Sequence, residues 1–340
     1  MAKWWSVLFG VVMLACLGLF IAAPFVTDEH GRAIWWLPLA VSTHAADVDR
    51  LFYIILGITG FFFILTEALL VVFMFQYAGR PGGQHALGAH PFEEKTSFLK
   101  RIFRPVSAVL HNQHRVELTW TFIPAVILLY IAFAQVSTWL EIKDKSRMPS
   151  IGGKQVPVQV EVSARQFEWR VRYPSSERLD KWLNNKSDKK TVDDFNSFAR
   201  MPQQDDVHLV NEVHLWKEQT LLVQLRTIDV IHSFNIPSMR VKQDALPGKV
   251  IPVWFTPTRA NTRYEEKEWR DGIDIETGKN DPGHYRWEIA CAELCGWGHH
   301  RMIGRVYVHE NRESFFRWLK QTEQKERQTA PQTEKIIAAR

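Results

Sequence analysis

Three apolar stretches in the first 140 residues constrain this chain of 340 residues more than any other feature. Residues 5–25 and 120–140 carry no charged side chain, and residues 52–76 carry only Glu67. As a helix, each stretch is long enough to cross a hydrocarbon core of about 30 Å. The second and third are apolar all round, which argues against buried helices of a soluble protein. The sequence therefore predicts a membrane protein.

The first apolar stretch allows two interpretations. Lys3 precedes it and small residues end it, as in a secretory signal peptide, but a retained transmembrane helix fits equally well. Cys16 does not indicate lipidation, because the chain after it stays apolar. We therefore predict that residues 1–26 form a signal peptide or an extra transmembrane helix. Residues 27–145 are predicted to form a transmembrane hairpin with a cytoplasmic loop.

Loop charges predict the orientation. Residues 77–119 contain six Lys and Arg against three Glu, and such an excess of basic residues is typical of cytoplasmic loops. Everything after residue 141 is then extracytoplasmic, and we expect a multi-pass protein of a bacterial plasma (inner) membrane with a periplasmic domain. Glu67 lies within a span, where an ionisable group faces protein or a polar cavity. It could bind a neighbouring helix or subunit, or relay protons.

From residue 155 the pattern changes to the period of two that half-buried strands show. Short strands separated by turns favour a β-sandwich or barrel. The two polar stretches 176–206 and 257–284 could be loops that partners touch, but we predict solvated surface segments, and a helix with a frayed end is expected after residue 311. The predicted strands lie at 156–173, 207–215, 219–227, 249–255, 285–290 and 303–309.

The richest cluster of potential metal ligands spans twelve residues and contains Cys291, Cys295, His299 and Met302. Soft sulfur ligands with imidazole select copper or zinc over magnesium or calcium. A structural zinc site usually takes four Cys or His, and a thioether suits copper better. A mononuclear blue-copper site needs only one Cys, whereas two thiolates can bridge two copper ions. Each copper would then need its own imidazole.

A second imidazole is available about 60 residues upstream. His232 stands in a strand-turn context, at a separation that suits two neighbouring loops at one end of a sandwich. His284 is a rival for this distal role, and His300 is a rival to His299 for the local one. We prefer His299 because it follows Cys295 by four residues.

Composition excludes several other classes. Lys and Arg exceed Asp and Glu by 42 − 37 = 5, and no basic run interleaved with aromatic residues occurs, so nucleic acid is not an expected partner. The chain has three cysteines, an odd number, which argues against a disulfide framework. A C-x-x-C-H motif does not occur, so no c-type haem domain is fused to the chain.

At this point the motifs resemble a known family. C-A-E-L-C-G-x-G-H-x-x-M, preceded by D-V-x-H-S-F, is similar to subunit II of haem–copper cytochrome c oxidases. The membrane segment VELTWTFIPAVILL and the strand segment QFEWRVRYP resemble the same family. The resemblance implies a cupredoxin-like all-β sandwich over residues 146–312, after the helical hairpin. A C-terminal helix and tail over residues 313–340 would follow.

The resemblance also implies a cofactor, the dinuclear copper centre called CuA. The ligands carried over residue by residue are Cys291 and Cys295 as bridging thiolates, His232 and His299 as terminal imidazoles, Met302 as an axial thioether and Glu293 through its backbone carbonyl. The Glu293 carboxylate is expected to help bind a Mg²⁺ shared with the catalytic subunit. Glu117 matches a Glu near the mouth of a proton path into that subunit.

The implied function is to receive electrons from a c-type cytochrome, or from a cytochrome domain, and to pass them to haem in catalytic subunit I. There O2 is reduced while protons are pumped, and other oxidase subunits and membrane lipid are further partners. This chain lacks the membrane-buried histidines that an O2-reducing site would need. Where the family has a Trp that accepts electrons, this chain has Phe167, so Phe167, Trp169 and Trp297 are candidates for electron transfer.

Three alternatives are less consistent with the sequence. The copper domain of nitrous-oxide reductase shares the loop pattern, but the membrane hairpin argues against it. A structural subunit of the quinol-oxidase type would lack Cys291 and Cys295. A copper carrier would have no use for the hairpin or for Glu117.

Overall fold

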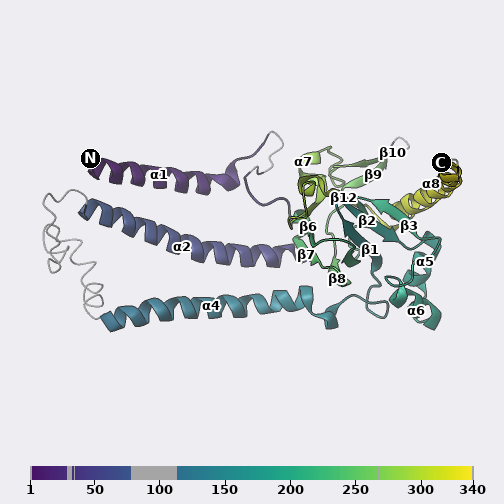
Figure 1. Cartoon of the computed structure of the whole chain (residues 1–340), viewed down its shortest axis with the longest axis horizontal. Helices are drawn as coiled ribbons and strands as arrows, with labels where there is room; N and C mark the ends of the chain where they lie inside the picture. Colours follow the sequence, from purple (N-terminus) through teal and green to yellow (C-terminus); the bar gives the residue numbers. More distant parts are fainter. Residues whose placement is uncertain (1, 29–32, 34, 78–112, 266–267, 339–340) are drawn as a thin grey trace. The chain divides into compact units, whose positions relative to one another are not determined.

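The computed structural model describes the chain except for residues 1, 29–32, 34, 78–112, 266–267 and 339–340. The predicted cytoplasmic loop at 77–119 lies almost entirely outside the described residues. The chain divides into two compact units, Met1–Phe25 with Asp49–Ser137 and Val26–Val48 with Thr138–Arg340. Each unit is described by itself, and Figure 1 shows the elements of both.

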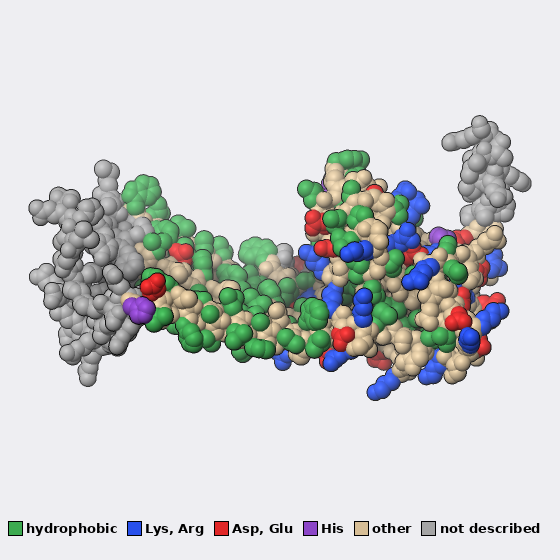
Figure 2. All heavy atoms as spheres, turned by 60° about the horizontal axis from the view of Figure 1, so that its bottom comes forward, with side chains coloured by type: hydrophobic (Ala, Val, Ile, Leu, Met, Phe, Trp, Pro, Cys, Tyr) green, Lys and Arg blue, Asp and Glu red, His purple; other side chains and the backbone are tan. Residues whose placement is uncertain are grey.

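The first unit consists of long helices. They are α1 (Ala2–Ala22), which a 3-10 turn at Ala23–Phe25 extends, α2 (Ala45–Tyr77) and α4 (Gln113–Lys143). All three are long and apolar enough to cross a membrane, as the sequence predicted for the second and third stretches and as one of the two interpretations of the first requires. Flanking turns make α2 and α4 longer than their apolar stretches, whereas α1 has the same length as its stretch. Apolar side chains cover the visible surface of these helices, whereas charged side chains cluster on the β-rich unit (Figure 2).

The second unit contains two sheets. The first has the strand order β3-β2-β1-β5-β8, in which β1 is antiparallel to β2 and parallel to β5. The second has the order β10-β9-β12-β11-β6-β7, with β4 paired parallel to β12. The first sheet comprises β1 (Val158–Arg165), β2 (Glu168–Tyr173), β3 (Val207–Val210), β5 (Leu221–Thr227) and β8 (Ile251–Phe255). The second comprises β4 (Glu212–Trp216), β6 (His232–Ile236), β7 (Val241–Ala245), β9 (Thr262–Glu265), β10 (Glu268–Asp271), β11 (Trp287–Cys291) and β12 (Ile303–His309).

Large aromatic side chains fill the core of this unit. Trp169, Phe234 and Trp287 are fully buried, and the rings of Trp169 and Phe234 meet edge to face at 5.4 Å. The rigid core fixes the ends of β1, β2, β6 and β11, from which the candidate site is built. All six predicted strand segments contain strands, although Asn211, with φ of +61°, splits the second segment into β3 and β4.

The prediction of solvated surface at 176–206 is wrong. This stretch forms α5 (Ser176–Asn184) and α6 (Lys189–Ser197), which bury Leu179, Trp182 and Phe195. The few apolar residues recur at helical spacing, but the many charged residues between them conceal the pattern in the sequence.

The stretch 257–284 also contains regular structure that the sequence did not predict. It forms the hairpin of β9 and β10, and the short helix α7 (Pro282–Tyr285) begins near its end. The last helix, α8 (Arg312–Ala338), continues through the predicted frayed end. Phe315 and Leu319 of α8 are fully buried, so this helix is part of the domain core.

The segment before α2 is hydrogen-bonded to the β-rich unit. Val41 N–H donates to the Ser238 carbonyl at 2.9 Å, and Thr43 N–H donates to the Thr256 carbonyl at 3.0 Å. These bonds explain why Val26–Val48 groups with the strands. The predicted domain boundaries at residues 26, 145 and 312 stay predictions.

Candidate metal centre

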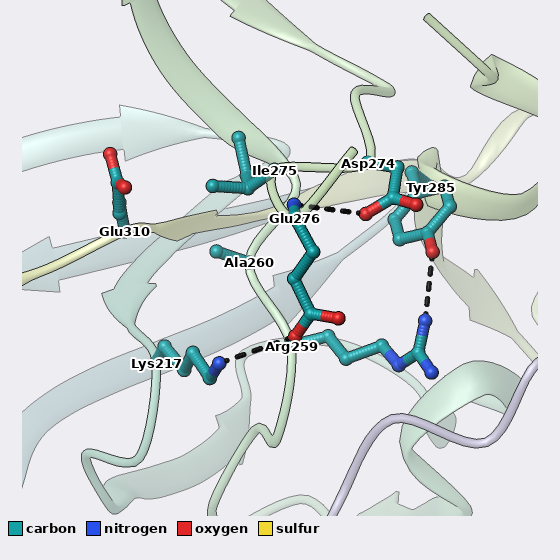
Figure 3. A pocket seen from close by; sticks show the side chains of 8 residues that line it. All are labelled: Lys217, Arg259, Ala260, Asp274, Ile275, Glu276, Tyr285 and Glu310. Atoms are coloured by element: carbon teal, nitrogen blue, oxygen red, sulfur yellow. Dashed lines mark hydrogen bonds and ion pairs between the residues drawn. The ribbon is translucent and has the colours of Figure 1, made fainter. Parts of the chain in front are cut away.

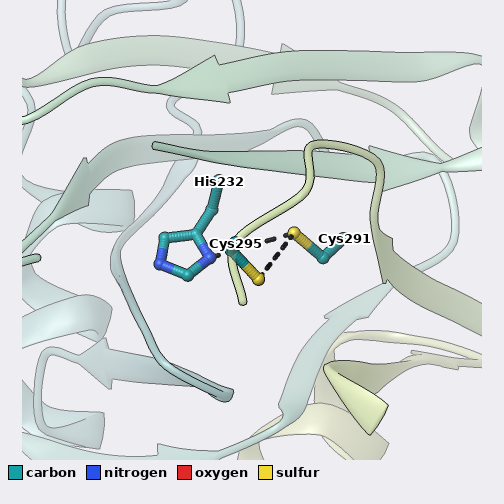
Figure 4. Close-up of side chains that lie close together, drawn as sticks. All are labelled: His232, Cys291 and Cys295. Carbon is teal, nitrogen blue, oxygen red and sulfur yellow. Dashed lines mark hydrogen bonds between the residues drawn. The ribbon is translucent and has the colours of Figure 1, made fainter. Parts of the chain in front are cut away.

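Strand pairing brings the first ligand candidates together. Cys291 is the last residue of β11 and lies opposite Phe234 of β6, so its thiol lies beside His232, the first residue of β6. The ligand atoms of His232, Cys291 and Cys295 all lie within 4.8 Å of one another. In Figure 4 the imidazole Nδ1 of His232 faces the two sulfur atoms.

The loop after β11 supplies the remaining candidates. The Cys295 sulfur lies 3.6 Å from Nδ1 of His299 and 3.9 Å from the sulfur of Met302. His299 begins a 3-10 turn that ends at Arg301, and Met302 directly follows this turn. The Met302 side chain is fully buried. Three sulfur groups and two imidazoles therefore converge on a small volume.

The two thiols are not joined. Their sulfur atoms lie 3.8 Å apart, whereas a disulfide needs about 2.05 Å. The Glu293 carbonyl lies 3.2 Å from the Cys291 sulfur, so this backbone oxygen also points into the cluster, while the Glu293 side chain is exposed. Sulfur, imidazole and carbonyl groups form a donor set that copper accepts readily.

Asp229 fixes the orientation of the His232 ring. Its Oδ1 lies 2.8 Å from Nε2 of His232, and hydrogen bonds hold the pKa of Asp229 below its usual value although desolvation opposes them. An ionised carboxylate only accepts hydrogen bonds, so Nε2 carries the proton. Nδ1 faces the thiols, and once it is unprotonated it offers the lone pair that a metal ligand requires.

The two thiols differ in acidity. Desolvation acts to raise the pKa of Cys291, but hydrogen bonds with His232 and with the backbone at Ser233 and Glu293 outweigh it and lower the pKa to about 6. Desolvation and the neighbouring Cys291 thiolate raise the pKa of Cys295 to about 11. Cys291 is therefore the more acidic of the two thiols, and a soft metal ion that binds both sulfurs must displace the proton of Cys295.

The rival histidines lie elsewhere. Nδ1 of His284 lies 2.9 Å from Asp281 in α7, and His300 is exposed on the turn that carries His299. Within the described residues, the cluster therefore contains the histidines that the sequence favoured. The ligand roles themselves stay predictions.

The aromatic candidates for electron transfer differ in exposure. Trp297 is 80% exposed, Phe167 is half-buried, and their rings meet edge to face at 5.1 Å. Trp169 is fully buried, with its ring centre 6.3 Å from that of His232. Trp297 is therefore the aromatic side chain that a soluble partner can touch, and Trp169 supports the site from within.

Sequence reasoning missed Gln166. This residue lies in the turn between β1 and β2, and its side chain reaches the carbonyl of Cys295. The only feature of the sequence that could have pointed to Gln166 is its position beside Phe167 in the QFEW segment. Glu117 belongs to the other unit, near the start of α4, where its side chain is exposed.

A pocket of about 210 Å³ elsewhere in the β-rich unit holds none of these residues (Figure 3). Both of its basic side chains have partners. Lys217 lies 3.5 Å from Glu276, and Arg259 donates to the hydroxyl of Tyr285 at 2.8 Å. The sulfur–imidazole cluster is therefore the stronger candidate.

The fold and the cluster define a membrane-anchored β-sandwich protein whose Cys and His side chains could bind copper. Two family models match the chain, "Cytochrome C oxidase subunit II, periplasmic domain" over residues 158–268 and "Cytochrome C oxidase subunit II, transmembrane domain" over residues 97–137. The first match contains His232 but ends before Cys291.

Similar proteins agree with these matches. An alternative cytochrome c oxidase subunit 2 of Bradyrhizobium diazoefficiens is 24% identical, and the alignment covers 91% of each chain. A cytochrome c oxidase subunit 2 of Cereibacter sphaeroides is 25% identical over 62% of this chain and 61% of its own. The periplasmic domain of subunit II of cytochrome oxidase from Bradyrhizobium japonicum aligns with 51% of this chain and 97% of its own, at 19% identity and a TM-score of 0.33.

Both family models and these relatives thus carry the name of cytochrome c oxidase subunit II, the family that the motifs of this chain resemble. The chain is anchored in a membrane and carries an extracytoplasmic, cupredoxin-like domain.

Proposed function

We propose that this chain is the electron-accepting subunit of a haem–copper oxidase and holds a dinuclear CuA centre. Such a centre takes up and releases one electron at a time between a c-type cytochrome and a haem of the catalytic subunit. The observation that carries the proposal is the pair of sulfur atoms 3.8 Å apart, with an imidazole within hydrogen-bonding distance of each. One thiolate can serve one copper ion, whereas two opposed thiolates suit a bridge between two.

The proposed ligand roles are those that the resemblance implies, and the same geometry supports them. Cys291 and Cys295 would bridge the ions, with His232 and His299 as terminal ligands. Met302 and the Glu293 carbonyl would bind at the outer positions. The loop holds these groups in a fixed and largely buried arrangement, which keeps the rearrangement on electron transfer small.

The exposed Trp297 ring and the Phe167 ring behind it are the proposed point where electrons arrive. If a donor stacks on Trp297, the rings of Trp297 and Phe167 and the metal-binding loop would lie between this donor and the sulfur cluster. The proposed donor is a c-type cytochrome or a cytochrome domain, and the proposed acceptor is haem in catalytic subunit I.

Two further roles are part of the proposal. The exposed carboxylate of Glu293 would share a Mg²⁺ with the catalytic subunit, since carboxylate oxygen is a ligand that this hard cation prefers. Glu117 would stand at the mouth of a proton path, in a multi-pass chain of a bacterial plasma membrane whose hairpin contacts lipid and the other oxidase subunits.

The proposal is tested on the complete oxidase, purified in detergent. We expect the mixed-valence centre to give a seven-line EPR pattern, because one unpaired spin is shared by two equivalent copper nuclei. Cys291→Ser should abolish this pattern and the associated copper, since an alcohol does not replace a bridging thiolate. Cys16→Ser is the matched control, because Cys16 is an exposed cysteine of α1, and it should leave the spectrum unchanged.

A four-line spectrum, or binding of zinc in place of copper, would contradict the dinuclear assignment. The choice of imidazole is tested in the same assay, because His299→Ala should abolish the pattern and His300→Ala should not. The reverse result would transfer the ligand role to His300.

A further inference from the structure

Gln166 lies between the two segments that carry the ligand candidates. Its side-chain Nε2 donates to the backbone carbonyl of Cys295 at 2.5 Å. Its backbone N–H donates to Oδ2 of Asp229 at 2.8 Å. The other carboxylate oxygen of Asp229 lies 2.8 Å from Nε2 of His232. One residue therefore links the Cys295 loop to the carboxylate that orients the distal imidazole.

The turn that carries Gln166 is a firm support. β1 and β2 pair on both sides of the turn, from Arg165 with Glu168 to Glu161 with Arg172. Trp169, three residues beyond Gln166, is fully buried and anchors the start of β2 in the core. The donor group of Gln166 is thus attached to the rigid sheet rather than to a free loop.

Packing brings the same turn against the metal-binding loop. A Cβ atom at Gly298 would lie 2.4 Å from the ring of Phe167, and one at Gly296 would lie 2.9 Å from Nε2 of Gln166. Gly296 has a φ of +130°, a conformation that other residues rarely adopt. The loop therefore lies directly on the turn, and the two glycines permit this close approach.

We propose that Gln166 is a positioning residue of the metal centre. By holding the Cys295 carbonyl and the Asp229 carboxylate at once, it fixes the thiol of Cys295 relative to the imidazole of His232. The inference rests on the proposed function, and it assigns to Gln166 a role in metal affinity and in the electronic structure of the centre. The amide is suited to this role because it donates to a carbonyl, which neither a thioether nor an ionised carboxylate does.

The test compares Gln166→Met with wild type in the complete oxidase. Methionine keeps the length of the side chain and removes only the donor. Loss of a group that orients a metal ligand commonly costs about 10- to 100-fold in metal affinity, and we expect a loss in this range in competition with a copper chelator. The copper hyperfine splitting in the EPR spectrum should also change, because the angle at Cys295 is no longer fixed.

Gln159→Met is the matched control. Gln159 also donates to a buried backbone carbonyl, that of Phe195, at 2.9 Å, and it belongs to β1, the strand that leads into the turn of Gln166. Its substitution should lower the free energy of unfolding and leave copper affinity and the EPR spectrum unchanged. A change of the spectrum in both variants would mean that general loosening of the domain is responsible, which overturns the proposal.

The proposal would also be overturned if Gln166→Met kept the wild-type copper affinity and hyperfine splitting. This holds even if the variant oxidised the donor more slowly, because a positioning role requires a change in the metal centre. Should this variant fail to accumulate, Gln166→Asn keeps the amide with a shorter reach, and it should show a smaller loss in the same two measurements. Wild-type values for Gln166→Asn would then count against the proposal. Failure of the proposed function can be distinguished from failure of this proposal, because the wild-type protein itself would then lack the EPR pattern of two coupled copper ions.

Discussion

The two ends of the β-rich domain differ in how well their buried polar groups are satisfied by partners. Figure 1 shows the end of the domain that carries α5 and α6. There Arg172 and Arg178 share the buried carboxylate of Asp206, at 2.5 and 2.8 Å. At the end that carries β6, the sulfur atoms of Cys291 and Cys295 face each other at 3.8 Å. Thiols are weak hydrogen-bond donors, so these contacts satisfy them poorly.

The difference separates groups that stabilise the fold from groups that await a ligand. Around Arg172 the chain provides every partner, including Glu161 and the Phe198 carbonyl, so this network is complete within the molecule. At the other end, sulfur and imidazole atoms converge without opposite charges to neutralise a second thiolate. We therefore expect substitutions at the first end to change stability and those at the second to change the metal centre.

The largest expected effect is on stability at the helical end. Arg172→Met leaves Asp206 with Arg178 alone and Glu161 with Arg226 alone, and removing one partner of a buried ion pair costs up to about 3–5 kcal/mol. Urea unfolding followed by Trp fluorescence measures the loss, and the copper EPR spectrum of the folded variant should not change. Arg170→Met is the control, because Arg170 is exposed and its pair with Glu168 contributes about 0–1 kcal/mol. A loss equal in both variants would contradict the comparison.

An intermediate effect is expected on the pH dependence of stability, and it concerns a buried histidine pair that belongs to neither end. His214 and His309 lie 3.1 Å apart, and the ring of His214 stacks on Trp318 of α8 and on Tyr307. Burial holds the pKa of both side chains well below the usual value, and the neighbouring His214 lowers that of His309 further. Glu212, 3.5 Å from His214, is the carboxylate that faces the pair.

Because the folded protein keeps these histidines neutral, the unfolded chain takes up more protons below about pH 6.5. The free energy of unfolding should therefore fall as the pH drops from about 6.5 to 5.5, by about 1 kcal/mol for each histidine, and by up to about 1.4 kcal/mol per pH unit below that range. Comparison with His214→Phe measures the effect of the pair, because this variant removes His214 and also its influence on the pKa of His309. Equal pH dependence in the two proteins would show that the histidine pair is not responsible.

The smallest expected effect on stability lies at the metal end. Trp297→Ala removes an exposed ring, and surface substitutions usually change stability by less than about 0.5 kcal/mol. The copper spectrum should stay the same while oxidation of the reduced cytochrome slows, because the outer aromatic contact is lost. Leu294→Ala, in the same loop and similarly exposed, tests whether apolar contact alone matters. An unchanged rate in Trp297→Ala would move the point of electron arrival elsewhere.

Much of the site could be predicted from local spacing. Cys291, Cys295, His299 and Met302 lie within one loop, so their convergence depends on a few backbone turns. The three membrane spans were equally accessible, because length and composition decide them. The helices in 176–206 escaped prediction because their apolar faces are narrow, and their charges, such as Arg178 and Asp194, are paired inside the fold.

The sequence by itself determined that the chain crosses a membrane and that one loop carries two thiols, an imidazole and a thioether. Only the tertiary structure decided which distant groups complete the cluster. His232 reaches Cys291 because β6 pairs with β11, and Gln166 reaches Cys295 because the turn after β1 packs on the loop. The physical reason is that local patterns act over a few residues, whereas register and packing depend on how the whole core closes.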